Sequence, residues 1–249
     1  MTAWAIDLDG VIWRGTEPVP GASEAVAALR DGGHSVAFVT NSAARTPAQV
    51  AAKLALQGID DAEELVVTSA MAAATLVQPG ERVFVVGGAG LRQALIDVDA
   101  ELVDDGGPVD AVAVGITPDF DYAMLHRAMT AIRAGARFIA SNDDSTFPTE
   151  SGLLPGAGAL IAAVQTATDV PPEIAGKPHG PMAELVRSRF GTEGIMVGDR
   201  PETDGLFGQR LGYHFALVLS GVTVESDLPV EPTPKYVTAD IAELVANLL

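Results

Sequence analysis

Two aspartates near the N-terminus, Asp7 and Asp9, are the first residues of this chain whose types and spacing could do chemistry. They follow an apolar run that predicts a short buried strand, and Gly10 then permits a sharp turn. Side chains two residues apart on an extended segment share a face, so both carboxylates point into one small volume. Like charges this close repel unless a cation or a shared proton relieves them. The pair therefore indicates a metal site or an acid–base site, although a solvated Asp-x-Asp-Gly turn fits the same residues.

Three further polar groups lie just past predicted strands or at the start of a predicted helix. They are Thr40-Asn41-Ser42, Gly176-Lys177-Pro178, and the run from Gly198 to Asp204. Ligands of open parallel sheets bind beyond the carboxyl ends of the strands, and three of the four groups fall at such ends. Taken singly, each group also fits a turn, a surface lysine or a helix cap. Together and in this order they indicate one site.

The side chains of these groups have complementary chemistry. Asp7 and Asp199 can supply hard oxygen ligands, which suit Mg²⁺ with its shell completed by water and substrate oxygens. The Thr40 hydroxyl, the Asn41 amide and nearby backbone N–H groups can hold phosphoryl oxygens. Lys177 adds a compact positive charge. One carboxylate is then free for nucleophilic attack and the other for proton transfer to the leaving oxygen, which is the chemistry of phosphoryl transfer.

The elements that must position these side chains follow an alternation of short apolar runs and Ala-rich stretches, typical of a parallel α/β sheet. Thr46, Pro47 and Gln49 mark one helix start with a capping box. Expected strands cover residues 3–8, 35–39, 65–68, 82–86, 111–114, 137–140, 194–198 and 215–219, and expected helices cover residues 23–30, 70–76, 122–133, 158–166, 181–190 and 241–249.

Two linker-like stretches, near residues 78–80 and 169–173, divide the chain. The 136 residues from Asn41 to Lys177 (177 − 41) are far more than one crossover connection needs. We therefore predict a core built from residues 1–78 and 176–249, with a second domain, residues 79–175, inserted between them. Such an insert would cover the site, exclude water and supply substrate contacts.

The four motifs resemble those of the haloacid dehalogenase superfamily of phosphatases, and within it the p-nitrophenylphosphatase- and NagD-like subgroup, whose cap lies between the second and third motifs. The matching stretches are Asp7-Leu8-Asp9-Gly10-Val11, Thr40-Asn41, Gly176-Lys177-Pro178, and Gly198-Asp199-Arg200 with Thr203-Asp204. Residues 138–144 and 155–159 in the insert and 220–223 near the end extend the likeness outside the site. The resemblance implies an α/β fold, a Rossmann-like core with a central parallel sheet plus a smaller inserted α/β cap domain.

The resemblance also implies an activity, a Mg²⁺-dependent phosphatase that hydrolyses a small phosphate monoester through an aspartyl-phosphate intermediate. Asp7 would be the nucleophile and a metal ligand. Asp9 would protonate the leaving alcohol and then activate water, with its backbone carbonyl on the metal. Lys177 would pair with Asp7 and the phosphate. The presence of Asp9 favours a phosphatase over a dehalogenase.

The binding residues are implied in the same way. Thr40, Asn41 and Ser42 would hold the phosphoryl group. Asp199 would complete the metal site, and Asp204 would support it from outside the ligand shell.

Two positions depart from the family's usual pattern. Ser42 stands where the family often has asparagine, which shortens or removes a polar contact. Gly205 stands where an apolar residue is common, which predicts a looser turn after Asp204.

Composition limits the other classes of function. The chain has 249 residues and no cysteine, and the lack of cysteine excludes thiolate catalysis. Its formal net charge of −18 disfavours nucleic acid or anionic membranes as partners. No apolar run approaches the roughly 20 residues of a membrane span, and no signal-type segment is seen, so we expect a cytoplasmic protein. We expect a small phosphorylated metabolite as the partner. Whether the protein forms a homodimer is left open by the sequence.

Two rival functions share the same fold. A phosphotransferase would use the same aspartyl-phosphate with an acceptor other than water, and a catalytically silent protein would only bind a phosphorylated ligand. Asn142, Asp143 and Asp144 of the insert are candidates for substrate specificity, or equally a capped loop. The run Gly87-Gly88-Ala89-Gly90 lacks the third glycine of a dinucleotide fingerprint, so it predicts a tight strand-to-helix turn.

Overall fold

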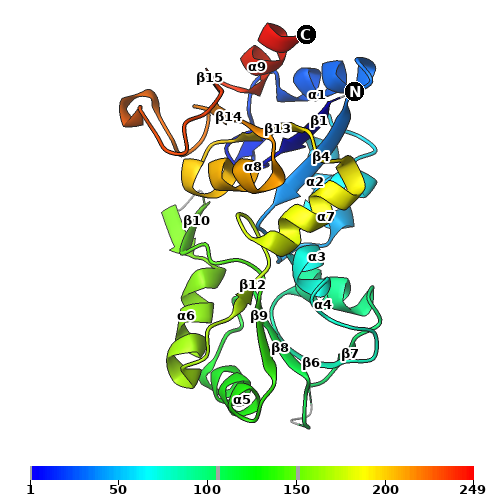
Figure 1. Cartoon of the computed structure of the whole chain (residues 1–249), viewed down its shortest axis with the longest axis vertical. Helices are drawn as coiled ribbons and strands as arrows, with labels where there is room; N and C mark the ends of the chain where they lie inside the picture. The colour runs from blue at the N-terminus through cyan, green and yellow to red at the C-terminus, as the bar shows by residue number, and fades with distance from the viewer. Residues whose placement is uncertain (1, 105–106, 150–151) are drawn as a thin grey trace. The chain divides into compact units, whose positions relative to one another are not determined.

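The alternating pattern of the sequence folds into two separate parallel sheets, each in its own unit of the chain (Figure 1). The structure is a computed structural model that describes residues 2–104, 107–149 and 152–249. The first unit contains Met1–Thr40, Pro47–Val67 and Lys177–Leu249, and the second contains Asn41–Thr46 and Thr68–Gly176.

The sheet of the first unit has six strands in the order β15-β14-β13-β1-β4-β5. β1 is central and pairs in parallel with β13 and with β4, and β14 and β15 continue the parallel arrangement beyond β13. The strands are β1 (Ala3–Ile6), β4 (Ser35–Thr40), β5 (Val66–Thr68), β13 (Gly194–Gly198), β14 (His214–Val218) and β15 (Tyr236–Thr238).

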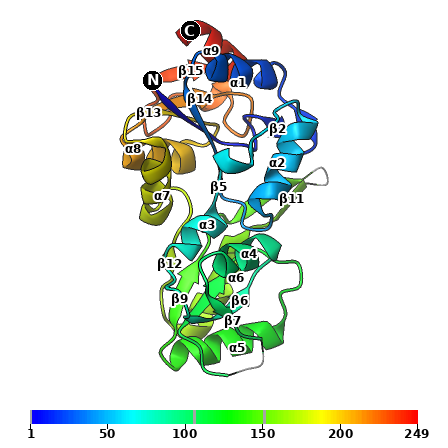
Figure 2. The same cartoon turned by 90° about the vertical axis from the view of Figure 1, so that its right-hand side faces the viewer.

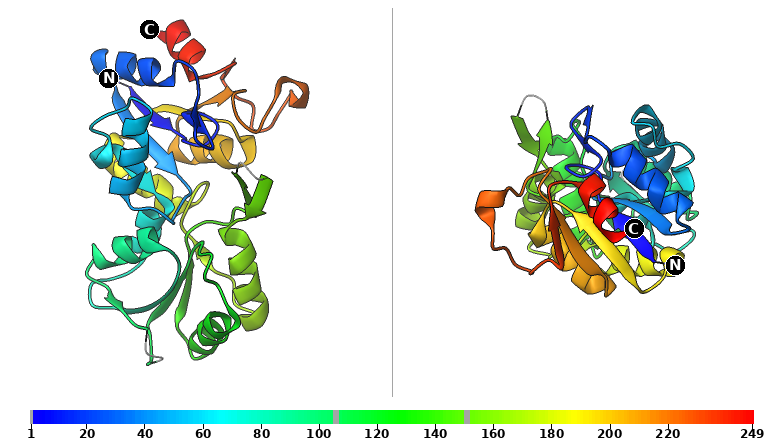
Figure 3. Two further views of the ribbon diagram at one scale, coloured as in Figure 1. Left: turned by 180° about the vertical axis from the view of Figure 1, so that it is seen from behind. Right: turned by 90° about the horizontal axis from the view of Figure 1, so that it is seen from above.

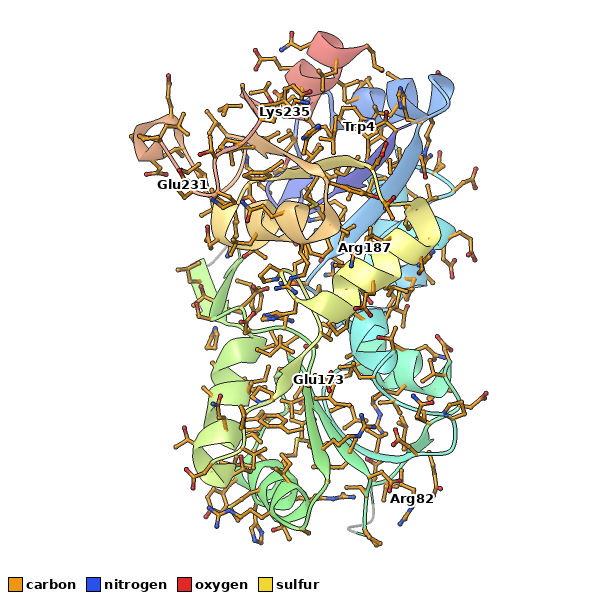
Figure 4. The ribbon with its side chains drawn as sticks, in the orientation of Figure 1. Trp4, Arg82, Glu173, Arg187, Glu231 and Lys235 are labelled. Carbon is orange, nitrogen blue, oxygen red and sulfur yellow. The ribbon has the colours of Figure 1, made fainter. Side chains whose placement is uncertain are left out.

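Helices cover both faces of this sheet. On one face α1 (Ala22–Asp31), α2 (Pro47–Leu56) and α9 (Ile241–Leu248) bury apolar side chains in a core that includes Trp4, Ile6 and Phe38 of the strands. The blue and cyan α1 and α2 lie in front of the sheet in the left view of Figure 3, and Trp4 is labelled in Figure 4.

The other face carries α7 (Gly180–Phe190) and α8 (Leu206–Leu211), which lie in front in Figure 1. These two helices also bind each other, because Nη1 of Arg187 in α7 donates to the main-chain carbonyl of Arg210 in α8 at 2.7 Å (Arg187 is labelled in Figure 4). Because helices cover both faces of the sheet, its central strands are buried on both sides. Their residues are almost wholly apolar, as expected of a parallel sheet. Shorter pieces of this unit are the hairpin β2 (Trp13–Arg14) and β3 (Glu17–Pro18) and helical turns at Glu63–Leu65, Pro201–Gly205 and Glu225–Asp227.

The second unit is built on a five-stranded sheet in the order β12-β9-β8-β6-β7, with every neighbouring pair parallel. Its strands are β6 (Arg82–Val86), β7 (Glu101–Leu102), β8 (Ala111–Val114), β9 (Arg137–Ala140) and β12 (Glu173–Ile174), and β10 (Thr146–Thr149) pairs with β11 (Gly152–Pro155) in a separate antiparallel hairpin.

Two helices, α5 (Tyr122–Arg133) and α6 (Ala157–Thr168), bury Ile132 and Ile161 against Phe84 and Val112 of this sheet. The other two, α3 (Ser69–Ala74) and α4 (Ala89–Ile96), pack against each other (Figure 2). The result is a second α/β layer structure with its own core.

The structure divides the chain differently from the expected boundary at residue 79. The second unit already begins at Thr68, because α3 packs against α4, and it also includes Asn41–Thr46. Glu173, the last residue of the stretch expected as the second linker, already belongs to β12 of this unit's sheet. The first strand ends at Ile6 rather than at residue 8, because the carbonyl of Leu8 already accepts hydrogen bonds from Ile12 and Trp13 in a turn.

Candidate active site

Asp7, Thr40 and Asp199 lie at the carboxyl ends of three adjacent strands of the first unit. Asp7 directly follows β1, Thr40 is the last residue of β4, and Asp199 directly follows β13. β1 lies between β4 and β13, and the sequence order of the strands reverses there. Ligands of open α/β sheets bind at such a switch point. The sheet therefore brings these three predicted residues to one edge.

Three carboxylates form a cluster at this edge. Asp7, Asp199 and Asp204 each offer an oxygen within 4.8 Å of the others, and they are 8%, 2% and 2% exposed. Buried like charges at this spacing repel unless a cation compensates them. Carboxylate oxygens are the hard ligands that Mg²⁺ and Ca²⁺ prefer, so the donor set fits a divalent cation.

The Lys177 ammonium is the cation that the protein itself places on this cluster. Its Nζ donates to Asp7 Oδ1 at 2.5 Å, to Asp204 Oδ1 at 2.8 Å and to the Val39 carbonyl at 3.3 Å. Burial alone would lower the pKa of Lys177, but the carboxylates of Asp204 and Asp7 outweigh it and raise that pKa. Lys177 is therefore charged, and its single positive charge offsets one of the three carboxylates.

Burial has the opposite effect on the acids. It is the main cause that raises the pKa of Asp7 well above its usual value, against the lowering effect of Lys177. Burial and then the neighbouring Asp204 raise the pKa of Asp199 to about 6. Burial therefore disfavours the ionised form of both carboxylates, and a bound cation would favour it.

The loop after β14 holds Asp199 in place. The backbone N–H of Val222 donates to Asp199 Oδ2 at 2.6 Å, and the Thr223 hydroxyl donates to the Asp199 carbonyl at 2.6 Å. A Cβ on Gly221 would lie 1.9 Å from Asp199 Oδ2, and one on Gly10, whose φ is +87°, would lie 2.3 Å from it. Sequence reasoning placed residues 220–223 outside the site. The signal that could have found them is a Ser-Gly turn directly after a strand next to β13.

Asp204 is held equally closely. Its Oδ2 accepts the backbone N–H of Arg200 at 3.2 Å, and a Cβ on Gly198 would lie 2.3 Å from its carboxylate. The turn that follows is not loose, contrary to the expectation from Gly205. A Cβ on Gly205 would lie 2.7 Å from Pro232, so glycine permits close packing at this position.

Asp9 has a different environment from Asp7, although only Leu8 separates them. It is exposed, and its Oδ1 accepts a hydrogen bond from Trp13 Nε1 at 2.8 Å. Its carboxylate is not part of the acidic cluster of the described residues. The expectation that its backbone carbonyl lies on the metal stays a prediction.

The three residues predicted to bind phosphate fall on both sides of a unit boundary. Thr40 is buried at the end of β4 in the first unit, whereas Asn41 and Ser42 belong to the second. Within the second unit, Asn41 Nδ2 donates to Asp144 Oδ1 at 3.3 Å.

The glycine-rich turn at residues 87–90 joins β6 to α4, as expected of a strand-to-helix turn. His179 is the N-cap residue of α7, two positions after Lys177.

Among the described residues, no helix is long and apolar enough to cross a lipid bilayer.

Two family models match most of the chain. The model described as haloacid dehalogenase-like hydrolase covers residues 4–101, and the one described as HAD-hydrolase-like covers residues 174–244. The matches contain the residues of the acidic cluster and Lys177.

Curated relatives and solved structures match over nearly the full length. An acid sugar phosphatase of Staphylococcus epidermidis is 36% identical over 99% of this chain and 97% of its own length. The 5'-nucleotidase YutF of Bacillus subtilis is 41% identical over 88% of each chain. The glycerol phosphate phosphatase of Mycobacterium tuberculosis, solved in complex with magnesium, has a TM-score of 0.91 and 37% identity over 98% of this chain and 76% of that one.

The fold and the site define a hydrolase with a parallel α/β core and an acidic, metal-type centre, and the chain belongs to the haloacid dehalogenase-like hydrolases. Within that family it is a phosphoric monoester hydrolase of the p-nitrophenylphosphatase- and NagD-like group.

Proposed function

We propose that this protein hydrolyses small phosphate monoesters with Mg²⁺, through an aspartyl-phosphate on Asp7. The observation that carries the proposal is the buried cluster of Asp7, Asp199 and Asp204 with Lys177 bonded to two of its members. Two of the three negative charges lack compensation by that lysine, so the residues present fit a divalent cation. Asp7 and Asp199 would hold it with the Asp9 carbonyl, and Asp204 would orient Lys177.

The residues perform the reaction in two steps. The Asp7 carboxylate attacks phosphorus, the bond to the ester oxygen breaks, and Asp9 gives its proton to that oxygen as the alcohol leaves. Asp9, now ionised, takes a proton from water, whose oxygen attacks phosphorus and releases Asp7 and inorganic phosphate. Lys177 neutralises negative charge that shifts onto Asp7 and the phosphoryl oxygens. Bound Mg²⁺ supplies further charge neutralisation and orients the phosphoryl group.

We assign catalysis to the first unit and substrate choice to the second. Relatives act by name on sugar phosphates, glycerol phosphate and 5'-nucleotides, and we place this enzyme's substrate in that range of small monoesters. The first unit carries Asp7, Asp9, Lys177 and Asp199, which belong to the chemistry common to all these esters.

The test is phosphate release from a panel of these esters with Mg²⁺ or with EDTA, for the wild type and Asp7→Asn. We expect hydrolysis that needs Mg²⁺ and that Asp7→Asn abolishes, because an amide cannot act as the nucleophile. Asp61→Asn makes the same chemical change at an exposed position of the first unit and should keep full activity. Equal activity in EDTA, or an active Asp7→Asn, contradicts the mechanism.

The two rival functions give different results in the same assay. A phosphotransferase would show substrate consumption that rises with an added alcohol acceptor and exceeds the inorganic phosphate released. A silent binding protein would bind the ester without turnover. The presence of both Asp7 and Asp9 favours hydrolysis over silent binding.

A further inference from the structure

The segment Asn41–Thr46, which directly follows Thr40, is held by side chains of the second unit. The main-chain carbonyl of Asn41 accepts two hydrogen bonds, one from Ser69 Oγ at 2.6 Å and one from Asn142 Nδ2 at 2.7 Å. Two donors on one carbonyl specify its direction, and with it the orientation of the peptide that joins Asn41 to Ser42.

Both donors are built into the interior of the second unit. Ser69 is the first residue of α3 and is fully buried, and Asn142 lies two residues after β9 and is 4% exposed. The Asn142 amide also donates to Ser141 Oγ at 3.2 Å, and its Oδ1 accepts the backbone N–H of Asp144 at 3.1 Å. Both ends of this amide are therefore hydrogen-bonded within the unit. This favours a positioning role for Asn142 over a direct contact with the variable part of a substrate.

The far end of the same segment is held by the glycine-rich turn. The backbone N–H of Gly90 donates to the carbonyl of Ala44 at 3.1 Å. A Cβ on Gly90 would lie 2.3 Å from the Arg45 carbonyl and 2.6 Å from that of Ala43, so only glycine fits there. The glycines at 88 and 90 thus serve close approach of another part of the backbone, which explains a glycine-rich turn without any nucleotide.

The start of the segment, at Asn41, is packed as closely as its far end. A Cβ on Gly176, the last residue of the second unit, would lie 2.6 Å from Asn41 Oδ1 and 2.6 Å from the Ser141 carbonyl. The segment that contains Asn41 and the last residue of this unit therefore pack closely, through the Asn41 side chain.

We propose that Ser69 and Asn142 are positioning residues for phosphate binding, acting through the main-chain carbonyl of Asn41. The inference rests on the proposed function, because it takes Thr40, Asn41 and Ser42 as the residues that hold the phosphoryl group. The phosphoryl group is common to every ester, so loss of either donor weakens all substrates by the same factor. A residue that contacts the alcohol part of the substrate would instead change the KM of some esters and leave that of others unchanged.

The experiment measures the dissociation constant of inorganic phosphate by calorimetry with Mg²⁺ present, and KM and kcat for several esters. We expect Ser69→Ala and Asn142→Asp each to raise the phosphate dissociation constant and every KM about tenfold, the size of one lost hydrogen bond in a buried site. Asn142→Asp keeps the acceptor for Asp144 and removes the donor, but it also adds a carboxylate, so Ser69→Ala is the variant that removes a donor without a change of charge. Ser69→Thr restores the hydroxyl and should recover most of the affinity.

Thr75→Ala is the matched control, because its hydroxyl donates to the Ala72 carbonyl of the same helix, α3, away from Asn41. This variant should leave the phosphate dissociation constant and the KM values unchanged. Unchanged phosphate affinity in folded Ser69→Ala and Asn142→Asp overturns the inference, and so does a KM change confined to particular esters. If the wild type binds phosphate but hydrolyses no ester, the proposed function fails while the phosphate affinities still decide the inference.

Discussion

Asp7 and Asp9 are chemically identical residues two positions apart, and their surroundings separate their properties. Asp7 is buried beside Lys177, whereas Asp9 is exposed and accepts a hydrogen bond from Trp13. A buried carboxylate aligned by an ammonium suits attack on phosphorus. A carboxylate that can exchange protons with solvent suits acid–base work. These two environments support the proposed roles of Asp7 as nucleophile and Asp9 as proton carrier.

Asp9→Asn tests this separation of duties with p-nitrophenyl phosphate. Its leaving group is acidic and needs little protonation, so the first step should survive while the second, which needs a base for water, should be slow. We expect a burst of about one p-nitrophenol per enzyme and a steady rate lower by roughly 10²–10⁴-fold. Stopped-flow absorbance measures both. Asp7→Asn should give no burst, and a steady rate of Asp9→Asn close to that of the wild type would contradict the role.

Elements rather than single residues determine the shape of the acidic cluster. The loop after β14 contributes no charged group to it, yet its backbone N–H at Val222 and its hydroxyl at Thr223 hold Asp199. Gly221 lets this loop pass closely over the Asp199 carboxylate. The position of β14 next to β13 brings the loop there.

Gly221→Ala is the corresponding prediction. Its Cβ would lie 1.9 Å from Asp199 Oδ2, so the carboxylate must move and the metal site should be impaired. We expect a loss of at least about tenfold in the apparent affinity for Mg²⁺, comparable to the removal of a partner that orients a metal ligand. Titration of activity with Mg²⁺ measures it. Gly180→Ala, where a Cβ meets nothing within 4 Å, is the control, and equal Mg²⁺ dependence of the two variants would refute the argument.

The whole molecule is strongly acidic, with a formal net charge of −18, and three of its carboxylates are buried at the site. The folded pKa of Asp199 is raised to about 6, and that of Asp7 is raised as well. A raised folded pKa means that the folded state binds protons more tightly than the unfolded chain. The stability contributed by these two groups is therefore complete below their unfolded pKa and is lost as the pH rises through the folded pKa.

The metal-free protein should accordingly gain more from Mg²⁺ at higher pH, because the ion binds the ionised carboxylates. We expect the rise in Tm on adding Mg²⁺ to be small near about pH 5 and larger near about pH 7, the interval around the raised pKa of Asp199. Scanning calorimetry with and without Mg²⁺ measures it. Asp199→Asn should reduce this pH dependence, and an equal rise in Tm at both pH values in the wild type would contradict it.

Much of the fold was predictable because apolar alternation and turn residues act locally. The three long strands of the second sheet and α5 were predicted with the bounds that the structure has. The short strands β7, β12 and β15 were not, since two or three residues carry too little periodicity. The second unit of the structure begins at Thr68 rather than at residue 79, because α3 packs against α4, and no local signal in the sequence shows that packing.

By itself, the sequence determined the α/β class, the candidate residues Asp7, Asp9, Lys177 and Asp199, and the family to which they belong. The class and the candidate residues follow from residue types and spacings in four motifs taken together, and the family follows from the resemblance of those motifs. Only the tertiary structure decided which groups surround these residues. Asp204 accepts a hydrogen bond from Lys177, and the backbone N–H of Val222 donates to Asp199. Ser69 and Asn142 donate to the Asn41 carbonyl. Those contacts join residues that are 23 to 101 positions apart, and that separation closes only when strands pair and helices pack.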